Sequence, residues 1–123
     1  MWEWGAYWAA VMNHEQQMYM IGAGYANGAA FAPLKGLFKT GVPYNHGNYS
    51  NATVDALIDL AGKTLDPVEN EEVLLAAQRV LMADAALVPI YNKLGIYVMS
   101  AKVRDFEMIP VETIRLDKTW IEQ

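Results

Sequence analysis

Hydrophobic and polar residues alternate with helical periodicity at the start of the chain. Five large side chains of the segment 2–12 fall at positions i, i+3, i+4, i+7 and i+8: Trp4, Tyr7, Trp8, Val11 and Met12. This spacing predicts an amphipathic helix that buries one apolar stripe. An aromatic platform for a sugar is the alternative use of these rings, but packing in a core explains them more simply.

Two further helices are predicted from their caps as well as from their periodicity. Asn51 is a favourable N-cap, and Asp59 stands four residues before Lys63, where an ion pair forms along a helix. The apolar face of this helix comprises Val54, Leu57, Ile58 and Ala61. The second helix begins with the cap Asp66, with Pro67 at its first position and Glu69 completing a capping box.

That second helix is expected to run to about Ala85. Its apolar stripe comprises Leu74, Ala77, Leu81 and Ala85, with Val73 and Val80 alongside. A shorter helix is predicted over residues 29–38, although Pro33 and Gly36 weaken it. Residues 39–50 are rich in Gly, Pro and Asn and are predicted to form a loop.

Short apolar runs rich in β-branched and aromatic residues predict strands. One is expected at 16–21, two at 87–91 and 95–99, and one near 112–116. The spacing of the middle two suits a hairpin, and separate strands also fit. Trp120 is expected to anchor the C-terminal segment. The patterning as a whole therefore predicts an α/β chain with about four helices and three to four short strands.

Composition adds a bias towards burial. Hydrophobic residues make up 54% of the chain and charged residues 19%, which excludes intrinsic disorder. The net charge of −5 and the scattered cations argue against a nucleic-acid partner. Residues 1–50 contain only two acidic and two basic side chains, so we expect this half to be mostly covered. There is no cysteine, no apolar run long enough to cross a membrane, and no signal peptide pattern in this chain.

Candidate catalytic chemistry is sparse. Gly22, Gly24 and Gly28 are spaced somewhat like a nucleotide-binding turn, but no second parallel strand with a terminal acidic residue follows. His14 and His46 lie far apart and lack a metal-ligand spacing, so we expect them in loops or in satisfied hydrogen bonds. Neither serine lies in a nucleophile motif. The sequence therefore predicts no enzyme, no metal site and no cofactor.

Three blocks of the chain resemble a known family. They are residues 44–63, with Asn-Tyr-Ser-Asn followed by Val-Asp-Ala-Leu-Ile; residues 66–84, which run from Asp-Pro through Ala-Ala-Gln to Asp84; and residues 88–91, Val-Pro-Ile-Tyr. In order and spacing they are similar to the C-terminal part of family 5 extracellular solute-binding proteins, the dipeptide- and oligopeptide-binding group of ABC importers. The resemblance extends from Trp2 to at least residue 106.

The resemblance implies a fragment of a type II, two-lobed periplasmic-binding-protein fold. Residues 1–28 would end one lobe and cross to the other, and residues 29–123 would belong to that second lobe. The crossing would place Gly24, Tyr25, Ala26 and Asn27 at the ligand cleft. Peptide-binding members usually carry a Trp and an Asp in this turn, where Ala23 and Ala26 stand here. A buried ammonium without a carboxylate is unfavourable, which argues against a ligand with a free amine.

The functional expectation is therefore capture of a small solute or peptide outside the cytoplasmic membrane and delivery to a membrane permease. The parent protein would be extracellular or periplasmic and several times longer, and the 123-residue chain alone should have no measurable ligand affinity. Two alternatives remain open: an autonomous interaction module that oligomerises through its apolar N-terminal half, and a nucleotide-binding enzyme that uses Gly22, Gly24 and Gly28. We also expect the isolated chain to self-associate.

Overall fold

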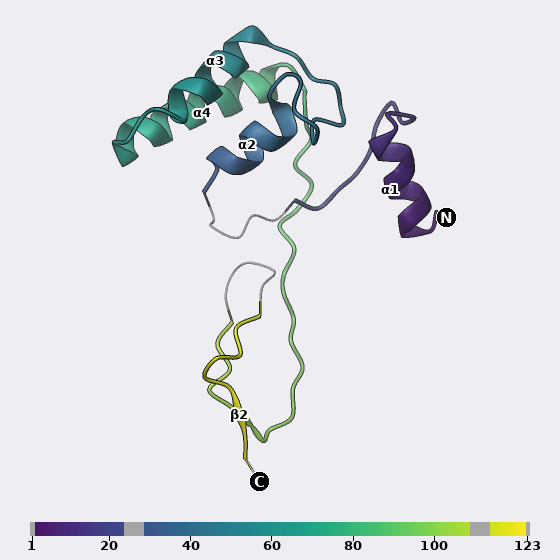
Figure 1. Ribbon diagram of the computed structural model, residues 1–123, viewed down its shortest axis with the longest axis vertical. Coiled ribbons are helices and arrows are strands. Elements are labelled where there is room, and N and C mark those ends of the chain that lie inside the picture. Colours follow the sequence, from purple (N-terminus) through teal and green to yellow (C-terminus); the bar gives the residue numbers. More distant parts are fainter. Residues whose placement is uncertain (1, 24–28, 109–113, 123) are drawn as a thin grey trace. The chain divides into compact units, whose positions relative to one another are not determined.

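The computed structural model describes residues 2–23, 29–108 and 114–122 (Figure 1). These residues divide into two units. The first contains residues 2–23 and 29–88, and the second contains the described residues from Pro89 onward. The expected mixture of helices and short strands is confirmed, with four helices and a two-stranded sheet in the described part of the chain. The expected division at residues 28 and 29 refers to the lobes of a parent protein and stays a prediction.

Helix α1, Trp4–Met12, begins where the sequence predicts. Glu3 is its N-cap, and its carboxylate accepts a hydrogen bond from the Ala6 N–H at 3.2 Å. The predicted apolar stripe is wrong in part. Val11 is buried, but Trp4 and Met12 are exposed, and the second fully buried position of the helix is Ala10. The periodicity therefore predicted the helix correctly but overstated how much of the stripe is covered.

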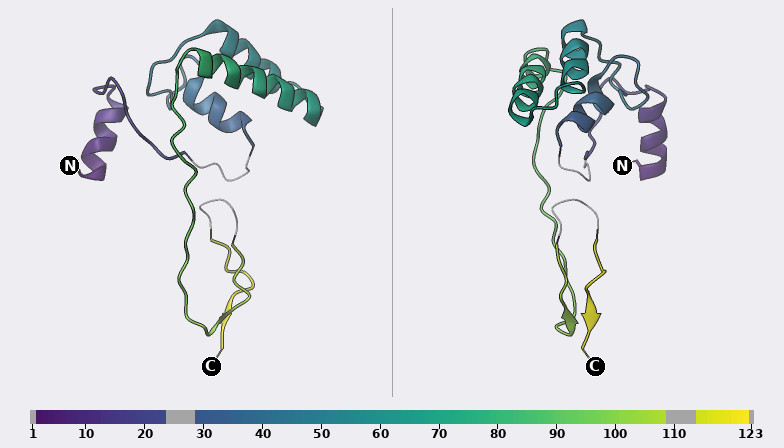
Figure 2. Two further views of the ribbon diagram at one scale, coloured as in Figure 1. Left: turned by 180° about the vertical axis from the view of Figure 1, so that it is seen from behind. Right: turned by 60° about the vertical axis from the view of Figure 1, so that its left-hand side comes forward.

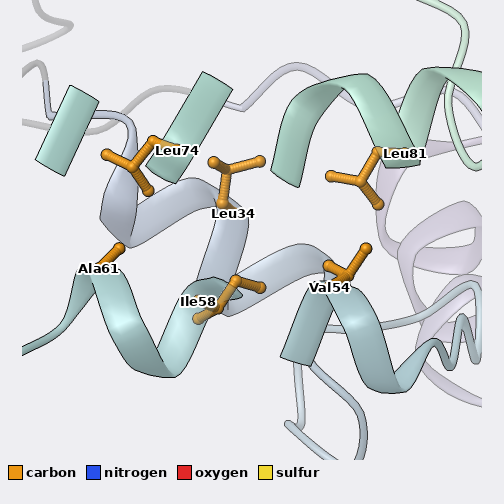
Figure 3. Packing of buried hydrophobic residues seen from close by; sticks show 6 residues of the cluster. All are labelled: Leu34, Val54, Ile58, Ala61, Leu74 and Leu81. Atoms are coloured by element: carbon orange, nitrogen blue, oxygen red, sulfur yellow. The ribbon is translucent and has the colours of Figure 1, made fainter. Parts of the chain in front are cut away.

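Helices α2 (Phe31–Phe38), α3 (Ala52–Ala61) and α4 (Pro67–Ala83) form the core of the first unit. The two views of Figure 2 agree that α3 and α4 lie side by side, with α2 against them. The buried cluster takes one leucine from α2 and the predicted apolar faces of α3 and α4 (Figure 3): Leu34, Val54, Ile58, Ala61, Leu74 and Leu81. Helical spacing thus identified the core correctly.

The ends of these helices follow the predicted capping chemistry. The Asn51 side-chain oxygen accepts from the Thr53 N–H at 2.8 Å, and the Asp66 carboxylate accepts from the Val68 and Glu69 N–H groups at 3.0 Å each. Helix α4 ends at Ala83, two residues before the predicted end, because Ala85 adopts a left-handed backbone with φ of 52°. Ala85 is exposed and does not extend the buried stripe.

One predicted ion pair is replaced by another. Asp59 binds the ammonium of Lys39, which follows α2, instead of pairing along its own helix with Lys63. Since the Thr40 N–H also donates to Asp55 at 2.9 Å, the end of α2 is attached to α3 at two points. Helix α2 also approaches the end of α3 closely, because a Cβ at Gly62 would lie 3.1 Å from the Phe31 ring.

The second unit contains very little regular structure. Strands β1 (Val103–Arg104) and β2 (Trp120–Ile121) pair antiparallel, and one bridge joins Glu107 to Arg115. The predicted strands at 87–91 and 95–99 are wrong, because no residue of 87–99 belongs to a strand or a bridge. The predicted strand at 16–21 is wrong for the same reason. The strand expected near 112–116 lies partly outside the described residues.

Trp120 anchors the C-terminal segment as expected. Its indole N–H donates to the Asp105 carboxylate at 2.7 Å, and Trp120 pairs with Arg104 across the sheet. The ring is nevertheless half exposed. Within the second unit none of the described residues is buried, and only Val103, Phe106 and Thr119 are partly covered. This anchoring therefore fixes the local backbone without creating a core.

Candidate functional site

The four residues expected to line a ligand cleft, Gly24, Tyr25, Ala26 and Asn27, lie outside the described residues, and so does Gly28. Gly22 is described. A Cβ built there would meet nothing within 4 Å, and its backbone is not in the left-handed region. Nothing in its surroundings therefore requires glycine, which leaves the nucleotide-binding alternative without support from this position.

The predicted loop at 39–50 contains a network of side-chain hydrogen bonds. Asn45 is its centre and is buried. Its amide nitrogen donates to the carbonyl oxygens of Lys39 and Tyr49 at 3.2 and 2.7 Å, and its amide oxygen accepts from the Tyr49 N–H at 3.0 Å. The Thr40 and Ser50 hydroxyls are 3.1 Å apart and close the base of the loop. One asparagine side chain thus links the two ends of the loop, in addition to the backbone hydrogen bonds within it.

A cavity of about 300 Å³ opens against this loop. No Asp, Glu, Lys or Arg side chain lines it; the lining residues are His14, Thr40, Gly41, Val42, Pro43, Asn45, Asn48, Tyr49 and Ser50. Three of them have left-handed backbones, with φ of 55° at His14, 75° at Gly41 and 50° at Asn48. A neutral polar lining suits a small uncharged hydrogen-bonding solute rather than an ion.

His46 belongs to this loop, and its ring lies inside an aromatic cage. Trp8 meets it edge-on with ring centroids 5.1 Å apart, and Tyr44, His14 and Tyr19 follow at 5.9, 6.2 and 6.3 Å. His46 is only 5% exposed, and neither of its ring nitrogens has a hydrogen-bond partner among the described residues. A buried polar group without a hydrogen-bond partner lowers the stability of a fold by about 1–3 kcal/mol, so the position of the His46 ring is unfavourable.

Burial and the neighbouring His14 both lower the pKa of His46, and burial has the larger effect. His14 is held differently. Its Nδ1 lies 2.9 Å from the His46 carbonyl oxygen. Because a carbonyl only accepts, His14 Nδ1 must carry the proton. We expected both histidines in loops or in satisfied hydrogen bonds; His46 lies in the predicted loop, although its ring nitrogens have no partner, and His14 forms a hydrogen bond. Their 32-residue separation gave no sign that they meet.

A second polar network connects the loop to the end of α4. The Tyr49 hydroxyl and the Asn51 amide donate to the same Asp84 oxygen at 2.6 and 2.7 Å. These two bonds lower the pKa of Asp84. Burial and the adjoining Asp84 together raise the pKa of Tyr49 to about 12. Asn51 therefore has two roles, since it caps α3 with its oxygen and binds Asp84 with its nitrogen.

Two other kinds of feature concern the described residues, namely metal centres and membrane-spanning helices. No group of three or more His, Asp or Glu side chains could hold a metal ion in this part of the chain. Across the same residues, no helix is both long and apolar enough to span a bilayer. What the site offers is a neutral polar cavity, a caged histidine and a hydrogen-bonded loop.

Comparison with known proteins adds no relative. No protein-family model, curated protein sequence or solved structure matches this chain.

Proposed function

We propose that this chain forms part of the substrate-binding component of an ABC importer for peptides or other small solutes. The observation that carries the proposal is the order and spacing of the three sequence blocks at 44–63, 66–84 and 88–91. In such a protein the ligand is held between two lobes without covalent chemistry. Ligand binding shifts the equilibrium between open and closed forms, and the closed form engages the permease.

The internal contacts of the first two blocks support this proposal. Their helices share one buried cluster, and Tyr49 and Asn51 of the first block bind Asp84 at the end of the second. The residues that carry the resemblance are thus used to hold one structural unit together. A chance match of unrelated short motifs would give no reason for the motifs to contact each other.

The exposed apolar side chains also support the proposal, because a two-lobed parent would cover them. Met18, Leu94, Ile96 and Val98 are each more than four-fifths exposed. Apolar exposure on this scale usually marks an interface with another surface. The same exposure favours the second candidate, an interaction module that oligomerises, so exposure alone does not separate the two.

The decisive experiment starts from the gene. If the proposal is right, the reading frame continues upstream of Met1 into some hundreds of codons that include a signal peptide. The full product, freed of bound ligand by unfolding and refolding, is then titrated by calorimetry with di- and tripeptides and with their N-acetylated forms. We expect binding by the full product, a preference for ligands without a free ammonium, and no measurable binding by residues 1–123 alone.

Two results would contradict the proposal. A stop codon directly upstream of Met1 would leave the interaction module as the better explanation. Micromolar peptide binding by residues 1–123 alone would show that no second lobe is needed.

A further inference from the structure

The ring of His46 is a contact point between residues 2–23 and the rest of the first unit. No member of the buried cluster of α2, α3 and α4 comes from α1. Instead, Trp8 of α1 and the following residues His14 and Tyr19 contact the ring of His46 in the 39–50 loop. The His14 ring also donates to the His46 carbonyl at 2.9 Å. Three aromatic rings and one hydrogen bond of the N-terminal segment therefore meet at His46, in addition to the burial of Ala10 and Val11.

The cage accommodates the neutral imidazole far better than the cation. Neutral His46 leaves one N–H and one lone pair without a partner. Protonation would replace that lone pair with a second N–H and add a positive charge, and no described group accepts either proton. A buried charge without a counterion is more unfavourable than a buried neutral dipole, so protonation penalises the closed cage.

The groups that face His46 offer no compensation. The titratable side chains in ring contact with it are His14 and Tyr19 from the N-terminal segment and Tyr44 from its own loop. None is a carboxylate. The nearest acidic residue along the segment, Glu15, accepts from the Asn13 amide at 3.1 Å. Proton binding by His14 would keep its bond to the carbonyl, because Nδ1 already carries a hydrogen. His46 is therefore the group whose protonation would place an uncompensated positive charge in this contact.

We propose that His46 is an acid-sensitive clasp, which holds residues 2–23 against the 39–50 loop when neutral and releases them when protonated. The sign follows from the lowered pKa of His46. A base whose folded-state pKa lies below its ordinary value of 6.5 contributes stability that is complete above that value and is lost as the pH falls through the folded-state pKa. Release is thus expected on the acid side of 6.5.

The test follows the histidine rings and the contact together. Long-range ¹H–¹⁵N spectra of the 123-residue chain are recorded from pH 8 to pH 4.5, alongside nuclear Overhauser contacts between Trp8 and His46. Amide exchange of α1, corrected for its intrinsic pH dependence, provides the second measurement. We expect His46 to titrate below pH 6.5, with the Trp8 contact and the exchange protection of α1 lost over the same interval.

Two variants separate the clasp from a merely structural ring. His46→Phe keeps a ring of similar size that cannot be protonated, so its N-terminal segment should stay attached down to pH 4.5. The matched control His14→Asn suits a left-handed backbone and leaves His46 in place. This control should keep the pH dependence, with the midpoint moved upward because the neighbouring positive charge is gone.

The proposal is overturned if His46 titrates at or above 6.5, which would mean that the aromatic faces stabilise the cation. It is also overturned if α1 stays protected after His46 is protonated, or if His46→Phe releases the segment over the same pH interval as the unmodified chain. Should His46→Phe lose its helical circular dichroism, His46→Leu and the titration of the unmodified chain decide the question.

Discussion

The core shared by α2, α3 and α4 can be tested by removing carbon atoms from it. Leu81 is fully buried, with 0% exposure, and Ile58 is 1% exposed. Leu81→Ala deletes three carbons at the contact between α4 and α3. Burial of each methylene-sized group is worth about 0.8 kcal/mol, and the cavity that remains adds to the loss.

These contributions give a loss of about 2–5 kcal/mol in the free energy of unfolding for Leu81→Ala. We expect the lower half of this range, because half-buried neighbours such as Val80 and Leu87 can move into the space. Ile58→Val deletes one methylene and should cost about 0.5–1.5 kcal/mol. The smaller change guards against complete unfolding, since a domain of this size has only a few kcal/mol of stability.

The assay is urea unfolding followed by far-ultraviolet circular dichroism, which reports the helices of the first unit. Leu65→Ala is the matched control, because Leu65 is 96% exposed and its truncation should change stability by less than about 0.5 kcal/mol. A loss below about 1 kcal/mol for Leu81→Ala, or equal losses for Leu81→Ala and Leu65→Ala, would refute the proposed core.

Three further predictions concern the loop network and the exposed surface. Asn51→Ala should lower the free energy of unfolding by about 1 kcal/mol, because the cap of α3 is lost. Asn51→Asp should keep this cap. It places a second carboxylate beside Asp84, so the Asp84 pKa should rise, which a carboxyl NMR titration measures. The pKa of Tyr49 is raised from 10.0 to about 12, so its contribution to the free energy of unfolding should be complete below pH 10 and lost as the pH rises through 12. Tyr49→Phe should remove this alkaline dependence of the free energy of unfolding, as measured by urea titrations at several pH values. Light scattering should give residues 1–123 a mass above 13.7 kDa, and a strictly monomeric mass at micromolar concentration would contradict self-association.

The helical part of the fold was predictable because its determinants are local. Asn51 and Asp66 form hydrogen bonds with N–H groups two or three residues away, and these bonds can be recognised from spacing alone. The buried faces of α3 and α4 follow from 3.6-residue periodicity. The error at Ala85 was also local, since a left-handed alanine is rare and no glycine or asparagine marked the end of the helix.

The strand predictions failed for a different physical reason. Residues such as Ile90, Tyr91 and Val98 have the β-branched and aromatic character of strands, but strand pairing requires a partner at the right distance. In this chain they are exposed and belong to no strand. Sequence patterns report what a segment is suited for, and they do not report whether its partner belongs to the same 123 residues.

The candidate site combines both situations. The polar character of the 39–50 loop was evident from its Gly, Pro and Asn content, but the role of Asn45 as its centre was not. The meeting of His14 and His46 depends on the path of residues 15–45, which no local rule specifies. Buried polar groups usually have hydrogen-bond partners, so a buried histidine without partners is not what a sequence pattern predicts.

The second unit is short and has no buried residue among those described. A segment of fewer than about 40 residues seldom keeps a fixed structure without disulfides, a metal ion or a partner. The chain has no cysteine, and no group of metal ligands occurs among its described residues. Residues 89–108 and 114–122, none of which is buried, would gain stability from a partner surface. Both functions considered for this chain supply such a surface, from a further lobe or from a second copy. They differ in which apolar residues are covered: an interface through the N-terminal half would leave Leu94, Ile96 and Val98 exposed, whereas a parent lobe would cover them.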